Sequence, residues 1–149
     1  MKLKDLLETR MQRSDLAMGL SQYVGDHYAL VGGFRSGSSP DGLTRLAYDI
    51  YDIELYNKHK DNPDKANVGK TELFVDNSNN IHGLVNIDLK PKARNVGAGK
   101  KLINDILDTT ADGQLVIYDI QKNAVGFWEK MGAELTRGNT RGIIKKHTV

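Results

Sequence analysis

Hydrophobic positions recur with helical spacing at the start of the chain, which predicts two helices before the first strand. The first helix spans 2–11, and the second begins at Ser14 or Asp15, either of which is a suitable N-cap. Their apolar faces consist of Leu3, Leu6, Leu7 and Met11 in the first helix, and of Leu16, Leu20, Tyr23 and Val24 in the second.

Alternating apolar and polar positions predict a series of strands in the middle of the chain. In one of these strands, over 43–56, the apolar positions change from even to odd numbers after Ile50, and this change of parity indicates a β-bulge. The strands span 27–34, 43–56, 71–75 and 81–89, with a loop over 35–42, a mobile loop over 57–69 and a turn over 76–80.

Helix and strand patterns alternate in the second half of the chain. The helix predicted over 97–109 has an apolar face, and a helix over 123–131 ends at Gly132, a residue suited to the left-handed conformation after a helix. The apolar face consists of Leu102, Ile103, Ile106 and Leu107, and the remaining strands span 115–120, 134–135 and 142–147.

The composition is that of one soluble globular domain. The chain has 149 residues, of which 39% are hydrophobic and 27% are charged. No apolar stretch approaches the length of a membrane span, and the N-terminus lacks the continuous apolar run of a signal peptide, so we expect a cytoplasmic protein with no membrane partner. The net charge of +2 is too small to indicate nucleic-acid binding.

The cysteine and histidine content excludes several kinds of site. The chain has no cysteine, which excludes disulfides, thiol catalysis and cysteine-ligated metals. Its histidines, His27, His59, His82 and His147, do not pair at a helical metal-ligand spacing, so no metal site is predicted.

The most informative segment is Arg-Asn-Val-Gly-Ala-Gly-Lys-Lys over 94–101, which joins a predicted strand to a predicted helix. The first N–H groups of a helix lack partners within the helix and, together with the helix dipole, attract a phosphate. Gly97 and Gly99 have no side chain, so a ligand can approach the main chain closely. The basic residues between 90 and 101, with no acidic residue among them, are Lys90, Lys92, Arg94, Lys100 and Lys101. The segment therefore predicts a binding site for a diphosphate.

Two common phosphate motifs do not fit this segment. A Walker P-loop requires glycine at 94 and serine or threonine at 101, where the chain has Arg94 and Lys101. A dinucleotide-binding fingerprint requires a third glycine at 102, where the chain has Leu102.

The pattern that fits is Q/R-x-x-G-x-G/A, filled by Arg94, Gly97 and Gly99, which resembles the acyl-CoA-binding motif of the GNAT superfamily of N-acetyltransferases. The segment 124–134 also resembles a later helix of that family, in which a small residue precedes an aromatic pair and the helix ends at glycine. Both motifs occur in the family's order and spacing, and the resemblance covers roughly 80–147.

The resemblance implies an α/β fold of the α+β type, with a mixed, mostly antiparallel sheet flanked by helices and with splayed central strands. One GNAT-like domain is then expected over 1–149. Its N-terminal region, 1–43, is atypical, because the family starts with a strand followed by two helices, whereas this chain is predicted to start with helices.

The implied function is acetyl-CoA-dependent transfer of an acetyl group to a primary amine by direct attack. The acceptor is left open among a small molecule, a peptide N-terminus and a lysine, and pairing through the sheets makes a homodimer a further expectation. The alternative is a GNAT-like domain that binds CoA or a protein partner without turnover. A nucleic-acid-binding module is a third interpretation, which the position of the basic residues at a helix start disfavours.

The resemblance also implies which residues bind the coenzyme. The main chain of Ile87, Asp88 and Leu89 would pair with the pantetheine arm like an added strand, and the Leu89 N–H is a candidate donor to the acetyl oxyanion. The complete expected set is Ile87, Asp88, Leu89, Arg94, Asn95, Val96, Gly97, Ala98, Gly99, Lys100, Asn123, Phe127 and Trp128. Three of these residues could have a role in the fold instead of contacting the coenzyme. Asn123 suits a helix N-cap, and Phe127 and Trp128 have the helical spacing of core residues.

The catalytic positions depart from the family pattern. Trp128 stands where the family often has a tyrosine that protonates the leaving thiolate, and an indole N–H is not a practical acid. Gly83 and Val116 stand at frequent positions of the general base, and neither can titrate. The candidates that could replace the missing general base are Glu72 and Tyr118. His82 and Asp119 are further titratable candidates. The alternative to a single base is a relay of water molecules.

Overall fold

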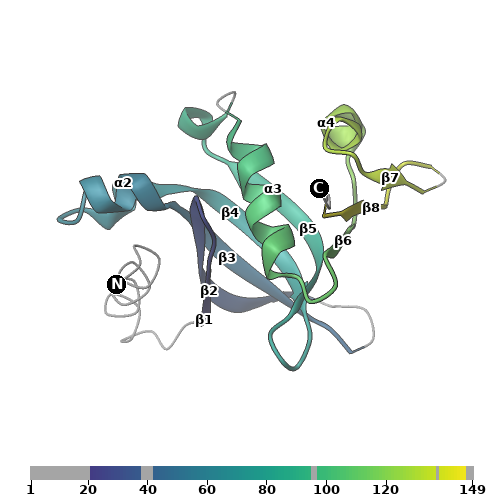
Figure 1. Cartoon of the computed structure of the whole chain (residues 1–149), viewed down its shortest axis with the longest axis horizontal. Helices are drawn as coiled ribbons and strands as arrows, with labels where there is room; N and C mark the ends of the chain where they lie inside the picture. The colour runs from purple at the N-terminus through teal and green to yellow at the C-terminus, as the bar shows by residue number, and fades with distance from the viewer. Residues whose placement is uncertain (1–20, 38–41, 95–96, 137, 147–149) are drawn as a thin grey trace.

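The computed structural model describes residues 21–37, 42–94, 97–136 and 138–146. These residues form one eight-stranded sheet in the order β1-β2-β3-β4-β5-β6-β8-β7, with helices packed on it (Figure 1). The strands are β1 (Ser21–Val24), β2 (Tyr28–Gly37), β3 (Thr44–Asp52), β4 (Asn67–Val75), β5 (Ile81–Leu89), β6 (Gln114–Ile117), β7 (Glu134–Leu135) and β8 (Gly142–Lys145). The helices are α2 (Ile53–Lys58), α3 (Ala98–Thr109) and α4 (Val125–Lys130), with short 3₁₀ helices η2 (Pro63–Ala66), η3 (Pro91–Ala93) and η4 (Lys122–Ala124).

Neighbouring strands of the described sheet are antiparallel except for β5 and β6, which are parallel. These two strands pair at Gly83 with Val116 and at Leu84 with Ile117. After Leu84, β5 continues to Leu89 with no paired strand on its β6 side among the described residues, so the two strands separate. The predicted fold class is therefore confirmed, because the sheet is mixed, mostly antiparallel, flanked by helices and splayed at its centre.

The main core lies between α3 and the sheet. The predicted apolar face of α3 is buried, with every member at most 4% exposed, and it packs with Leu73, Leu84 and Leu115 of the central strands. Because alternate residues of a strand point to opposite faces, Ala29 and Val31 of β2 belong to a smaller cluster that includes residues of α2.

The predicted second helix is wrong where the structure describes it. Tyr23 and Val24 lie in β1, where they pair with Leu30 and Ala29 of β2. Aromatic and β-branched side chains suit a paired strand, and this hairpin pairing outweighs the helical spacing. The other residues of the two predicted helices, 2–20, lie outside the described residues.

The predicted strand over 43–56 is too long. β3 ends at Asp52, whose carboxylate accepts a 3.0 Å hydrogen bond from the Leu55 N–H and thereby caps α2. Ile53 and Tyr56 are three residues apart, so both lie on the buried face of this helix. The predicted bulge in β3 is wrong, because the residue left out of the pairing after Ile50 is Val68 of β4. The change of parity instead reflects the start of α2, to which Ile53 and Leu55 belong.

Smaller differences concern the ends of elements. β2 continues to Gly37, through part of the predicted loop over 35–42, because it still pairs with β3 there. The predicted mobile loop over 57–69 contains the end of α2, η2 and the start of β4. β6 ends at Ile117, before the predicted 120, and Asp119 has a φ of 52° as the chain turns away from β5. The predicted helix over 123–131 is divided between η4 and α4, and Gly132 has the expected positive φ of 87°.

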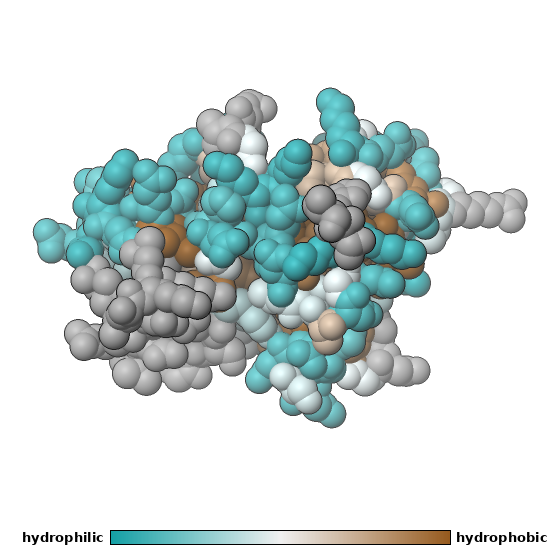
Figure 2. Space-filling model, viewed as in Figure 1, coloured by the Kyte–Doolittle hydropathy of each residue, from teal (hydrophilic) through white to brown (hydrophobic). Residues whose placement is uncertain are grey.

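Most of the described surface in Figure 2 is hydrophilic, with small hydrophobic areas between elements. The longest described helix, α3, has 12 residues. Within the described part of the chain, the helices lack the length and apolar character needed to span a bilayer.

Candidate functional site

The separation of β5 and β6 opens a cleft, and the start of α3 and the helix α4 contribute to its lining. Its volume is about 520 Å³, within the range of small-molecule sites. It is lined by β5 from Leu84 to Leu89, by residues 117–121, by the start of α3 and by α4. We call it the splay cleft.

Most of the predicted coenzyme-binding residues meet in the splay cleft. Those that line it are Ile87, Asp88, Leu89, Arg94, Gly97, Ala98, Gly99, Lys100, Phe127 and Trp128. Asn123 is exposed in η4 and is not one of the lining residues, and Asn95 and Val96 lie outside the described residues. Of the two predicted catalytic residues, Tyr118 lines the cleft and Glu72 does not.

The cleft also contains residues that the sequence patterns did not single out as ligand contacts. These are Leu84, Val85, Asn86, Ala93, Ile117, Ile120, Gln121 and Ala124. Ala124 is the small residue that precedes the aromatic pair, so the motif contained that signal. Most of the others depend on where β5 and β6 separate, which no local pattern reveals.

β5 presents an open edge of main chain to the splay cleft. The Lys90 N–H donates to the Val68 carbonyl of β4 at 2.8 Å, so the main chain of Lys90 points toward β4. Because this direction alternates along an antiparallel strand, Leu89 and Ile87 direct their N–H and C=O groups to the opposite side, into the gap. Among the described residues, the last backbone hydrogen bond between β5 and the segment after β6 runs from the Tyr118 N–H to the Leu84 carbonyl, at 2.8 Å.

The start of α3 faces the same cleft. Gly97 is the N-cap residue, with a φ of 74° that favours glycine, and it provides no side chain to cap the first N–H groups. Ala98, Gly99 and Lys100 form the first turn and line the cleft. The positive end of the helix dipole therefore lies beside the open edge of β5.

Glycine at 99 has a packing reason that the motif did not reveal. A Cβ added at this position would lie 3.1 Å from the ring of Phe127 on α4, which is a tight contact. Phe127 is 40% exposed and forms an edge-to-face pair with Trp128, with ring centroids 4.9 Å apart. Trp128 is only 6% exposed and belongs to the main core, as its helical spacing suggested.

The five basic residues between 90 and 101 are all exposed, but their side chains are not gathered at one site. Arg94 and Lys100 line the splay cleft. Lys92 donates from its Nζ to the Lys65 carbonyl at 2.9 Å, and Lys101 lines a separate cavity beside the β1–β2 turn. The positive charge at the cleft is therefore smaller than the sequence cluster suggests.

Glu72 is held in a polar network away from the cleft. Its Oε2 accepts hydrogen bonds from the Nε of Arg45 at 2.7 Å and from the hydroxyl of Ser36 at 2.9 Å. The hydrogen bond from Arg45, with a further contribution from Ser36, lowers the pKa of Glu72 although partial burial raises it. A carboxylate with a lowered pKa is a weak general base.

We expect Glu72→Gln to change the acid stability and to leave activity unaffected. The lowered pKa means that the ionised carboxylate stabilises the fold above its ordinary pKa of 4.5, and this stabilisation is lost as the pH falls through the folded-state pKa. The free energy of unfolding, measured by urea titration, should therefore decrease more steeply in acid for the wild type than for the variant. A large loss of turnover in a folded Glu72→Gln variant would instead return Glu72 to a catalytic role.

Tyr118 lies at the point where β5 and β6 separate. Its ring packs edge-to-face on Phe74, with centroids 4.8 Å apart, and the guanidinium carbon of Arg141 lies 4.7 Å from the ring centroid. A Cβ at Gly83 would lie 2.6 Å from the ring, so glycine there provides the space that Tyr118 occupies. Gly83 therefore has a packing role at the position where the family often has a base.

The other two titratable candidates differ in position. His82 lies at the start of β5, where its Nε2 is 2.7 Å from the Oδ2 of Asp76 in the β4–β5 turn, and it does not line the splay cleft. This contact, with N–H donors from Asn80 and Ser78, lowers the pKa of Asp76 to about 2. Asp119 lines the cleft and is exposed.

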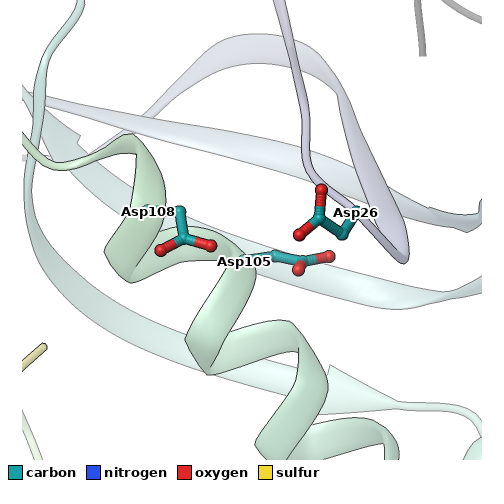
Figure 3. A group of neighbouring side chains, drawn as sticks. All are labelled: Asp26, Asp105 and Asp108. Carbon is teal, nitrogen blue, oxygen red and sulfur yellow. The ribbon is translucent and has the colours of Figure 1, made fainter. Parts of the chain in front are cut away.

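Three carboxylates gather where α3 meets the β1–β2 turn. Asp105 and Asp108 lie on this helix and Asp26 lies on the β1–β2 turn, with oxygen atoms within 4.8 Å of one another (Figure 3). The Oδ2 of Asp105 accepts hydrogen bonds of 2.9 Å from the N–H groups of His27 and Tyr28. The buried carboxylate of Asp105 therefore attaches the β1–β2 turn to α3.

No protein-family model matches the chain, and no curated protein matches it. Solved structures with similar architecture include a mutant of the AtaT toxin bound to the C-terminus of the antitoxin AtaR, with 14% identity, coverage of 69% of this chain and 68% of that chain, and a TM-score of 0.49. They include Arabidopsis thaliana Naa50 in complex with a bisubstrate analogue (15% identity, 68% and 72% coverage, TM-score 0.43). They also include nourseothricin acetyltransferase (13% identity, 89% and 92% coverage, TM-score 0.43). At these values the likeness concerns overall architecture and identifies neither an activity nor an acceptor.

Proposed function

We propose that this protein is an acetyl-CoA-dependent N-acetyltransferase of the GNAT type, which transfers an acetyl group to a primary amine by direct attack. The observation that carries the proposal is that the open edge of β5 and the uncapped start of α3 meet in the splay cleft. The strand edge suits an extended arm that contains amides, and the helix start suits a diphosphate. Coenzyme A joins these two groups in one molecule.

The position of α3 sets the direction of the acyl donor. With the diphosphate at the N–H groups of 97–100, an arm that follows β5 meets Leu89 first and Ile87 two residues deeper in the cleft. The thioester is at the far end of the arm. We therefore assign the contact with the acetyl oxyanion to the Ile87 N–H in preference to the Leu89 N–H.

Proton transfer is assigned to Tyr118 and water. The acceptor amine must lose a proton before its nitrogen attacks the thioester carbon, and the exposed mouth of the cleft lets water accept that proton. As the carbon–sulfur bond breaks, the Tyr118 hydroxyl protonates the thiolate and regains a proton from solvent. Glu72 is left out of this scheme because it is paired with Arg45 outside the cleft.

Tyr118→Phe tests this assignment. The variant removes the hydroxyl and keeps the ring that packs on Phe74. We expect kcat to fall by about a hundredfold, a typical effect for a lost general acid, while the affinity for acetyl-CoA stays within a few-fold. Release of free thiol measures turnover and calorimetry measures affinity. An unchanged kcat would remove Tyr118 from the chemistry.

The alternative function is coenzyme binding without turnover, and the buried Trp128 at the family's tyrosine position favours it. Calorimetry with CoA and a thiol-release assay with acetyl-CoA and a panel of amines distinguish the two. Binding with turnover on at least one amine supports the transferase. Binding with no turnover on any amine supports the alternative, and absence of binding contradicts both.

A further inference from the structure

Arg94 is directed back toward β5. Its Nε donates a 2.8 Å hydrogen bond to the carbonyl of Leu89, and its Nη2 lies 3.6 Å from the Oδ1 of Asp88. Arg94 directly follows η3, and its own N–H donates to the Pro91 carbonyl at 3.2 Å. The guanidinium therefore connects the segment before α3 to the end of β5.

The carbonyl that Arg94 engages belongs to the open edge of β5. Leu89 and Ile87 both direct their main chain into the gap, where an extended ligand would pair with them. With one acceptor position of its carbonyl used by Arg94, Leu89 presents mainly its N–H to such a ligand. Ile87 offers its C=O to the arm, since its N–H is assigned to the acetyl group. Strand-like pairing therefore starts at the Leu89 N–H.

We propose that Arg94 is a positioning residue for the acyl donor: it holds the end of β5 and restricts the arm to one register, rather than binding phosphate with its side chain. This inference rests on the proposed function, because the arm in question is the pantetheine arm of coenzyme A. The bond to the Leu89 carbonyl is the main contact, since the Asp88 carboxylate is 72% exposed and an exposed ion pair contributes little.

The two possible roles of Arg94 concern different parts of the ligand, the diphosphate and the pantetheine arm. A phosphate-binding arginine affects every ligand that carries the diphosphate, whereas a residue that sets the register of the arm affects only ligands that have the arm. 3′-Phosphoadenosine 5′-diphosphate has all the phosphates of CoA without the arm, and CoA has both. The two probes therefore separate the two roles of Arg94.

The experiment is calorimetry of Arg94→Ala with 3′-phosphoadenosine 5′-diphosphate and with CoA at physiological salt. We expect the affinity for CoA to fall by about tenfold, the effect of losing a hydrogen bond to a charged group, and the affinity for the diphosphate to change by less than about threefold. Arg94→Lys keeps the charge but not the planar donor group, so it should restore little of the CoA affinity. Lys100→Ala is the contrasting variant, because Lys100 lies on the first turn of α3 and its loss should weaken both probes by a similar factor.

An equal loss of affinity for both probes in Arg94→Ala, recovered in Arg94→Lys, would show that Arg94 binds phosphate and would overturn the inference. Unchanged CoA affinity would overturn it as well. Should Arg94→Ala have a lowered melting temperature, Arg94→Met provides the second variant, because it keeps most of the aliphatic stem and removes the donor to the Leu89 carbonyl, so the same selective loss is expected. A wild-type protein that binds neither probe contradicts the proposed function itself, which is a different result from the failures above.

Discussion

Gly99→Glu is expected to abolish coenzyme binding, with a loss of affinity of at least about a hundredfold for CoA. The new side chain would start 3.1 Å from the ring of Phe127, so either that ring or α3 must move. Its carboxylate would also place a negative charge at the first turn of α3, where the proposal places the diphosphate. Both effects oppose binding, and calorimetry with CoA measures their sum.

Gly126→Glu is the matched control. Gly126 is exposed on α4, and a Cβ there would have no atom within 4 Å outside its chain neighbours and its own helix. The variant makes the same change of charge near the same helix pair, and glutamate is a better helix former than glycine. CoA affinity should therefore stay close to that of the wild type. Wild-type affinity in Gly99→Glu would refute the placement of the diphosphate.

Trp128→Ala should cost more in stability than in turnover. The indole is 6% exposed and packs in the main core and on Phe127, so its removal leaves a cavity under α4. We expect the free energy of unfolding, measured in urea, to fall by roughly 3–5 kcal/mol. Turnover per folded molecule should decrease less than tenfold, because the indole is assigned to packing.

Phe127→Ala is the comparison for this second variant. Its ring is 40% exposed, so less apolar surface leaves the core and the loss of stability should be clearly smaller. A Trp128→Ala protein that melts like the wild type but has lost most of its turnover would show that the indole takes part in the chemistry.

The parts of the fold that depend on local patterns could be predicted from the sequence. The amphipathic spacing of α3 placed its buried face correctly, and the polar run between β4 and β5 located their turn. The spacing of glycines after Arg94 indicated a helix start that faces a ligand site, and Gly97 and Gly99 do line the splay cleft.

Most of the remaining features depend on contacts between parts of the chain that are distant in sequence. Glu72 had the chemistry of a base, but Arg45 and Ser36, on other strands, pair with it away from the cleft. The sequence explained Gly99 by the close approach of a ligand, and the structure adds a second reason, the ring of Phe127. The helical spacing of Tyr23 was overridden by its pairing with β2. The partners of Glu72 and Gly99 are distant in sequence, so no local pattern contains them, whereas Tyr23 pairs within a local hairpin.

A crystal structure of the protein with CoA tests the central claim most directly. The account predicts the diphosphate within hydrogen-bond distance of the N–H groups of 97–100, with the pantetheine arm paired to the main chain of Leu89 and Ile87. A diphosphate bound elsewhere on the protein, or an arm that leaves the gap between β5 and β6 empty, would contradict it.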